Sequence, residues 1–242
     1  MLTQEERLDY LMKENLRIIQ NDAVFSFSTD ALLLGHFTIP RKRDRILDLC
    51  TGNGVIPLLL SAKGNNNQIT GIEIQEQLVD MAQRSVAYNA LDDRIDIIHD
   101  DIQHVTQRYK PSSFDLITCN PPYFKANQVN QHQIEAHKIA RHEIYCTLDD
   151  CVRVSGHALK QGGRLMMVHR AERLLDIFEA MRRYQIEPKQ LHMIYSKVGK
   201  EAQTIVVEGR KGGNEGLKLA PPFYMYDASG HYTDEMKAIY YG

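Results

Sequence analysis

The feature that most restricts the fold is a regular alternation of strand-like and helix-like segments that begins at Arg45. Short runs rich in Ile, Leu and Val have the length of buried strands, and the segments between them carry apolar residues at helical spacing. Strands that alternate with helices form parallel sheets, because each helix returns the chain to the same edge. We expect strands at 45–50, 68–74, 94–99 and 114–119, with helices at 55–63 and 76–90.

The second half of the chain continues this pattern and then changes it. Only a short link joins the last two expected strands, which suits an antiparallel pair. Helices are expected at 148–160, ended by Gly162-Gly163, and at 171–184, with strands at 164–169, 190–196 and 202–210. The sequence therefore predicts an α/β fold: a doubly wound, mostly parallel seven-stranded sheet with helices on both faces and an antiparallel edge hairpin.

Length and apolar content predict a single domain. A chain of 242 residues can bury one substantial core, so 1–242 is interpreted as one unit. Within it, 1–44 reads as an N-terminal cover segment, 45–211 as the catalytic core, and 212–242 as an aromatic tail packed on the core. No apolar run approaches the ~18 residues that span a bilayer, so we expect a cytoplasmic protein without a membrane partner.

Charge and cysteine content exclude some classes of protein. A net charge of −2 and a pI near 6.6 argue against a protein that coats nucleic acid, but they leave an RNA substrate possible. The four cysteines form no C-x-x-C pair, and Cys50 and Cys119 lie within or next to expected strands. We therefore expect reduced core thiols and no metal site.

The stretch DLCTGNG has the pattern of a ligand-binding turn between a strand and a helix. Asp48 ends the first expected strand, and Gly52 and Gly54 form a tight turn that lets backbone N–H groups approach a ligand. A dinucleotide fingerprint would place Gly or Ala where this chain has Pro57. Glu73 ends the second strand, where a carboxylate can accept hydrogen bonds from both ribose hydroxyls. The pattern favours an adenosyl ligand without a pyrophosphate, although a purely structural turn would also explain the glycines.

The fourth expected strand ends in Asn120-Pro121-Pro122-Tyr123. A turn would explain the prolines, since they cannot continue a strand ladder. It would not explain why an amide and an aromatic ring follow a strand at the edge where open α/β sheets bind ligands.

Taken in order, the D-x-x-x-G-x-G pattern, Glu73, the stretch HDDI and the NPPY stretch resemble the class I S-adenosylmethionine-dependent methyltransferases, which have a Rossmann-like fold. The resemblance covers roughly 45–170. It implies S-adenosylmethionine as cofactor, with Asp48 near its methionine end and Asp101 at the adenine amino group. Asp100 remains the alternative to Asp101, and a cap or surface charge is the alternative for either. The implied cofactor contacts are Asp48, Thr51, Gly52, Gly54, Glu73, Ile74, Asp101, Ile102 and Asn120.

Two residues ahead of the first strand are further candidates for the cofactor pocket. Phe27 and Thr29 precede strand one, as pocket residues do in related enzymes. A packed phenylalanine and a helix cap explain them equally well.

The NPPY stretch implies methyl transfer to a planar nitrogen. An exocyclic amine conjugated to a ring is a poor nucleophile because its lone pair is delocalised. The Asn120 side-chain oxygen and the Pro121 carbonyl can accept its two N–H protons and favour a pyramidal nitrogen. Tyr123 offers a ring on which a planar substrate group stacks. Asn120, Pro121 and Tyr123 are therefore the candidate catalytic residues.

Adenine in DNA, adenine in RNA and a glutamine amide all fit this chemistry. Release-factor glutamine methyltransferases share the motif but carry a longer segment ahead of the cofactor loop, and this chain has no room for a DNA-recognition domain. The whole chain resembles the bacterial family that methylates adenosine N6 beside the anticodon of tRNA(Val), on the stretches FSFSTDALLLGHF, ARHE, YSKVGKEAQTIVVEGRKG and the aromatic tail. The resemblance implies a tRNA partner. A glutamine side chain of a release factor is the alternative substrate. A monomer is the default expectation for the oligomeric state. Basic groups at 41–43, 182–183 and 210–211 are candidate tRNA contacts, with solvated helix ends and loops as the favoured explanation.

Overall fold

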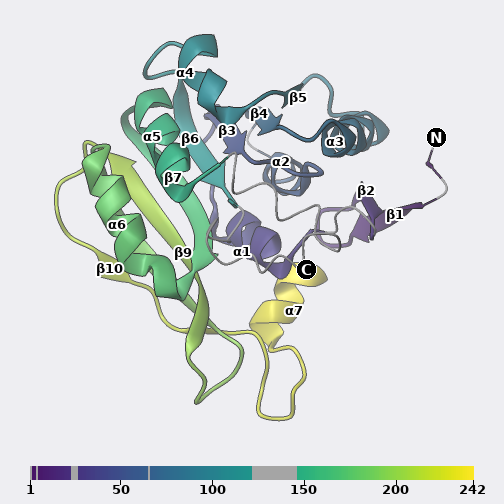
Figure 1. The fold of residues 1–242 in the computed structure, drawn as a ribbon. Helices are drawn as coiled ribbons and strands as arrows, with labels where there is room; N and C mark the ends of the chain where they lie inside the picture. Colours follow the sequence, from purple (N-terminus) through teal and green to yellow (C-terminus); the bar gives the residue numbers. More distant parts are fainter. Residues whose placement is uncertain (1, 4, 23–26, 65, 122–145) are drawn as a thin grey trace, which may run out of the picture.

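The computed structural model describes residues 2–3, 5–22, 27–64, 66–121 and 146–242. Tyr123 and the ARHE stretch lie outside these residues. At the centre is a sheet in the order β10-β8-β9-β7-β6-β3-β4-β5, with β11 also paired to β8 (Figure 1). Its seven longer strands are β3 Arg45–Leu49, β4 Gln68–Glu73, β5 Ile95–His99, β6 Phe114–Cys119, β7 Leu159–Arg170, β8 Ile186–Tyr195 and β9 Ala202–Lys211.

The predicted fold class is confirmed. Strands β3 to β7 pair in parallel, and β9 runs antiparallel to both β7 and β8. The antiparallel pair is thus present, with β9 placed between β7 and β8. Two short strands of the C-terminal segment, β10 Lys218–Leu219 and β11 Phe223–Tyr224, extend the sheet beyond the expected seven strands.

Helices cover both faces of the sheet, as Figure 1 shows. One face is covered by α1 (Thr29–Phe37), α2 (Val55–Ser61) and α3 (Glu76–Tyr88). The other is covered by α4 (Val105–Arg108), α5 (Leu148–Ala158) and α6 (Leu174–Arg183). None of the described helices is both long and apolar enough to cross a membrane.

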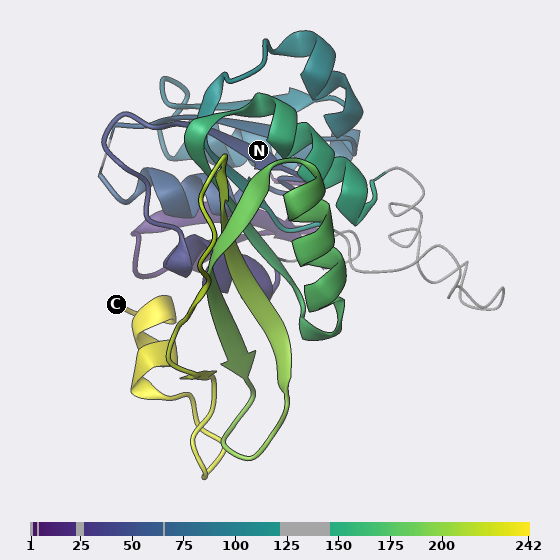
Figure 2. The same ribbon diagram turned by 90° about the vertical axis from the view of Figure 1, so that its left-hand side faces the viewer.

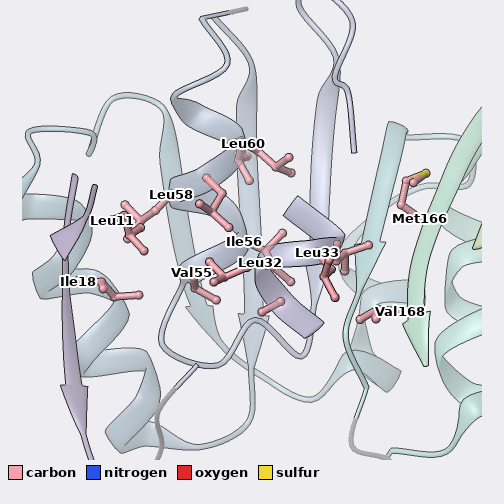
Figure 3. Close-up of a cluster of buried hydrophobic side chains, with 14 of the residues drawn as sticks. Leu11, Ile18, Leu32, Leu33, Val55, Ile56, Leu58, Leu60, Met166 and Val168 are labelled. Atoms are coloured by element: carbon pink, nitrogen blue, oxygen red, sulfur yellow. The ribbon is translucent and has the colours of Figure 1, made fainter. Parts of the chain in front are cut away.

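Two buried clusters follow from this arrangement, because successive strand residues point to opposite faces. The first joins α1 and α2 to the N-terminal hairpin β1 Glu6–Leu11 and β2 Leu16–Asn21, and includes Met166 and Val168 of β7 (Figure 3). The second holds Leu165 and Met167 of the same strand, together with apolar residues of α5 and α6.

The C-terminal segment packs beside the β8–β9 turn, as Figures 1 and 2 show. Met225 N–H donates to the Tyr195 carbonyl at 2.9 Å. Helix α7 (Asp234–Tyr240) follows, and its Met236 and Ile239 are buried in the first cluster.

Several elements differ from the boundaries expected from the sequence. The helix expected to reach residue 160 ends at Ala158, because β7 already begins at Leu159. The pairing between β6 and β7 is irregular between Phe114 and Leu116, so Gly162, with φ of 76°, belongs to a bulge and does not terminate a helix. Between β5 and β6 the direct link expected from the sequence contains a 3-10 turn, Ile102–His104, followed by α4.

Candidate active site

Parallel pairing brings the candidate residues to one edge of the sheet. Asp48 lies opposite Gly71 on one side and Thr118 on the other, and Leu49 lies opposite Cys119. Glu73 lies opposite His99, the last residue of β5. The residues that follow these strands, including Asp101 and Asn120, therefore share the carboxyl edge of the sheet.

The glycine loop is held close to the sheet by its backbone. Thr51 N–H donates to the Ile72 carbonyl at 3.0 Å, and Gly54 N–H donates to the Thr51 carbonyl at 3.0 Å. Gly52 and Gly54 have φ of 58° and 82°, a region that favours glycine. A Cβ on Gly54 would also lie 3.1 Å from the Cβ of Ala82. Both glycines are therefore required by backbone conformation, independently of any ligand.

Asp48 is fully buried, and threonine hydroxyls contact both of its carboxylate oxygens. Thr118 Oγ1 donates to Oδ1 at 2.6 Å, and Thr51 Oγ1 donates to Oδ2 at 2.5 Å. Burial raises the pKa of Asp48 to about 7, despite these two hydrogen bonds. In this structure Asp48 links β6 to the glycine loop, and a role beside the methionine end of the cofactor stays a prediction.

Gly71 has no side chain, and this leaves room for the hydrogen bond from Thr51 to Asp48. A Cβ at Gly71 would lie 2.8 Å from Thr51 Oγ1 and 2.8 Å from Ile97 Cδ1, which is closer than real Cβ atoms approach. Sequence reasoning missed both Gly71 and Thr118, because their importance comes from the strand register with Asp48.

Replacing Gly71 with alanine is expected to lower the free energy of unfolding by about 1–3 kcal/mol, the usual cost of overpacking. Thr51 would have to move away from Asp48, so cofactor affinity should fall as well. Chemical denaturation and calorimetry would measure the two effects. Gly64→Ala is the control for cofactor affinity, because its φ of 72° makes alanine costly for stability too, whereas a Cβ there meets nothing within 4 Å. Equal stability and affinity in Gly71→Ala and the unaltered chain would contradict this account.

Glu73 is a buried carboxylate that also organises the glycine loop. Its Oε2 accepts the Gly52 N–H at 3.0 Å, and its Oε1 accepts the Gln75 N–H at 3.0 Å. Each carboxylate oxygen has a second lone pair. These acceptor oxygens therefore fit a ribose whose hydroxyls would donate to them.

The two acids after β5 differ in their partners. Both oxygens of Asp100 are engaged, by His104 Nδ1 at 2.7 Å and by Arg108 at 2.7 Å. Asp101 caps the 3-10 turn by accepting the Gln103 N–H at 2.9 Å. This arrangement favours Asp101 over Asp100 as the adenine contact. Of the two flanking isoleucines, Ile74 is 36% exposed and offers an apolar surface, whereas the Ile102 side chain is buried in the second cluster.

The described contacts of Phe27 and Thr29 are structural. Phe27 packs against the first cluster, and its N–H donates to Gln20 Oε1 at 2.9 Å. Thr29 is the first residue of α1, which is capped by Ser28, and its hydroxyl lies 3.5 Å from that of Tyr240. A cofactor role for either residue stays a prediction.

Asn120 and Pro121 directly follow β6. Asn120 is half-buried and Pro121 is buried. Because Leu49 pairs with Cys119, the residue after β6 lies beside the residue after β3, at the start of the glycine loop. The chain thus leaves the sheet next to the candidate cofactor site. The stacking role of Tyr123 falls outside the described residues.

The three basic groups lie at the opposite edge of the sheet. Residues 41–43 precede β3, residues 182–183 end α6 before β8, and residues 210–211 end the antiparallel strand β9. Arg182 pairs with Glu187 at 2.9 Å and Arg183 with Asp149 at 2.7 Å. The position of 41–43 and 210–211 argues against contacts with a substrate bound at Asn120, whereas the Arg183 side chain reaches the first turn of α5.

Comparison with known proteins adds a family and a fold. The chain matches the methyltransferase small domain family over residues 15–185. It is 28% identical to the tRNA1(Val) (adenine(37)-N6)-methyltransferase of Haemophilus influenzae strain PittGG, over 91% of this chain and 92% of that protein. It is 30% identical to the protein of the same name from Glaesserella parasuis, over 74% of each chain.

Among solved structures, the fold is similar to that of a predicted O-methyltransferase from Agrobacterium tumefaciens. The TM-score is 0.70 at 20% sequence identity, and the match covers 87% of this chain and 95% of that one. At this identity the likeness concerns the fold.

Proposed function

The chain belongs to the methyltransferase small domain family and is an S-adenosylmethionine-dependent methyltransferase, and from this premise we propose that its acceptor is the N6 amine of an adenosine in tRNA, next to the anticodon of tRNA(Val). The observation that carries the proposal is the register of β3 and β6. It places Asn120 and Pro121 beside the glycine loop, where a bound amine would meet the methyl donor.

The chain's own residues would bind and orient both reactants. The Glu73 carboxylate and the glycine loop would hold the ribose, Asp101 the adenine amino group, and Ile74 the adenine face. S-adenosylmethionine supplies an electrophilic sulfonium methyl group. The Asn120 side-chain oxygen and the Pro121 carbonyl would accept hydrogen bonds from the two N–H groups of the target amine and thereby favour the pyramidal nitrogen of the transition state. As the nitrogen takes the methyl group, S-adenosylhomocysteine would leave, and the methylated amine would release one proton to solvent. A side-chain amide is not basic enough to take up a proton. Asn120 would therefore act by orienting the target amine and by hydrogen bonding to it in the transition state.

Glutamine in a release factor is the alternative acceptor, since its amide nitrogen is also planar. A relative named as a tRNA methyltransferase aligns with 91% of this chain and 92% of its own length, which supports RNA as the substrate. A monomer in the cytoplasm stays the expectation.

The surface that would bind the tRNA is formed by the β8–β9 turn and the C-terminal segment that packs beside it. Strand β8 ends at the same edge as β7, and the turn that follows carries exposed Lys197 and Lys200. Tyr195 lies against Tyr224, with ring centroids 5.5 Å apart. Exposed cations can neutralise phosphates, and the half-buried rings of Tyr195 and Tyr224 would offer their accessible edges or faces to bases.

Reversing the charge of Lys197 and Lys200 together, each to glutamate, is expected to weaken tRNA binding by at least about tenfold at moderate salt and to flatten its salt dependence. Cofactor affinity should not change. The matched control reverses Lys42 and Arg43, two exposed cations at the opposite edge. Filter binding across a salt series would test this. Equal losses in both variants would argue against the β8–β9 turn as the RNA surface.

The test of the proposed function is nucleoside analysis of tRNA with and without the gene. N6-methyladenosine in tRNA(Val) should disappear without the gene and return when purified enzyme and S-adenosylmethionine are added. Methylation of a release-factor peptide with no change in tRNA would support the glutamine reading.

A further inference from the structure

The four cysteines of the chain meet at one point, although they come from separate parts of the sequence. Cys50 follows β3, Cys119 ends β6, Cys146 precedes α5 and Cys151 lies within α5. Core packing alone would explain one or two buried thiols. It does not explain why all four gather where three elements of the fold meet.

The distances between the sulfur atoms match those of a metal site. The Sγ atoms of Cys50, Cys119 and Cys151 all lie within 4.8 Å of one another. Cys146 Sγ lies beside this group of three, at 3.5 Å from Cys50 Sγ and 3.1 Å from Cys151 Sγ. Four sulfurs around one zinc ion at about 2.3 Å lie about 3.8 Å apart. A disulfide would need a distance of about 2.05 Å.

We propose that Cys50, Cys119, Cys146 and Cys151 bind one zinc ion in a tetrahedral tetrathiolate site. Binding of Zn²⁺ to four thiols forms four Zn–S bonds and releases four protons, and no electron transfer is needed. Zinc is favoured because thiolate ligands in tetrahedral geometry are typical of its structural sites. This revises the expectation of a chain without a metal site.

The surroundings of the cluster fit a closed structural site. Cys119 and Cys151 are fully buried and Cys146 is 8% exposed, all within the second apolar cluster. The Asp48–Thr118 pair lies across the sheet from it, because Thr118 and the adjacent Cys119 point to opposite faces. The metal site would therefore be distinct from the carboxylates expected to hold the cofactor.

The backbone at Cys50 supports a role for its thiol. Its φ is 56°, in the left-handed region that glycine adopts without steric cost. A glycine would therefore suit this turn better if packing were the only requirement. The cysteine keeps a sulfur in the cluster at a position where the backbone disfavours any side chain.

A zinc ion here would tie together three parts of the candidate active site. Cys50 lies in the turn that leads to Gly52, Cys119 is the residue before Asn120, and Cys146 and Cys151 belong to the start of α5. The ion would fix the end of β6 relative to the glycine loop. Metal binding itself does not depend on the identity of the methyl acceptor.

The experiment uses the full chain, purified with a reductant and without a chelator or metal-binding tag. Mass spectrometry of the metal content should find about one zinc ion per chain. After removal of the metal, titration with Co²⁺ should produce the thiolate charge-transfer and intense visible bands of a tetrahedral thiolate site. Added Zn²⁺ should abolish these bands and protect all four thiols from a thiol reagent.

Two variants locate the site. Cys146→Ser and Cys151→Ser should each lose most of the cobalt charge-transfer absorption, whereas Ser155→Ala should keep it. Ser155 is a matched control, because it is buried on α5 and its hydroxyl only bonds the Cys151 carbonyl, at 2.7 Å. If the variants do not fold, the cobalt titration of the unaltered chain decides. The proposal is overturned if that chain shows no thiolate band, if its thiols react equally with and without zinc, or if two of them are found as a disulfide.

Discussion

Replacing Asn120 with alanine is expected to lower the rate of methyl transfer by about 10²-fold or more, in line with the loss of other transition-state hydrogen bonds. The side-chain oxygen is needed mainly when the target amine becomes pyramidal. Affinity for S-adenosylmethionine should therefore change little. Single-turnover methylation of tRNA measures the first effect, and calorimetry measures the second.

The matched control for Asn120→Ala changes the neighbouring aromatic residue. Tyr123→Phe keeps the ring face on which an adenine would stack and should retain most of the activity, whereas Tyr123→Ala should lose both productive binding and turnover. If Asn120→Ala methylates tRNA at the normal rate while Tyr123→Phe is inactive, the hydrogen-bonding mechanism is wrong.

The strands and the shared edge could be predicted from the sequence for a simple physical reason. Buried parallel strands are short apolar runs, and each candidate residue lies at the carboxyl end of one of them or within two residues after it. Knowing the strand ends is then sufficient to bring Asp48, Glu73, Asp101 and Asn120 to one edge.

Contacts that depend on register could not be predicted. Gly71 and Thr118 carry no motif, and they matter because the pairing of β3 with both neighbours places them beside Asp48. The bulge at Gly162 could not be predicted either, because two glycines after a helical pattern usually end the helix. Helix α4 is too short to show helical periodicity.

The cysteine cluster illustrates the same limit on a larger scale. Metal sites are recognised in a sequence by closely spaced pairs of ligands, and no two of these cysteines have the C-x-x-C spacing. Only the crossing of β3, β6 and α5 brings the four sulfurs together. The expectation of reduced core thiols agrees with four free cysteines, of which Cys119, Cys146 and Cys151 are buried, but their spacing did not indicate that they gather in one place.

Glu73 provides the second large effect, because one carboxylate is expected to serve both the loop and the cofactor. Glu73→Ala leaves the N–H groups of Gly52 and Gln75 without their acceptor. A buried donor without a partner costs about 1–3 kcal/mol, and only the Gly52 N–H is buried whereas the Gln75 N–H is part-buried, so the free energy of unfolding should fall by about 1–3 kcal/mol. Loss of hydrogen bonds from the ribose hydroxyls to a charged acceptor should also weaken cofactor binding by about 10²-fold.

Two further variants separate these roles of Glu73. Glu73→Gln keeps one acceptor oxygen and turns an NH₂ group toward the other donor, so its stability and cofactor affinity should lie between those of the alanine variant and the unaltered chain. Glu76→Ala removes an exposed carboxylate from the start of α3, so it should leave cofactor affinity unchanged and cost at most about 1 kcal/mol of stability. Denaturation without cofactor and calorimetry with S-adenosylmethionine give the two readouts. If Glu73→Ala is destabilised but binds the cofactor with full affinity, the carboxylate only supports the loop, and the ribose must be held by other residues.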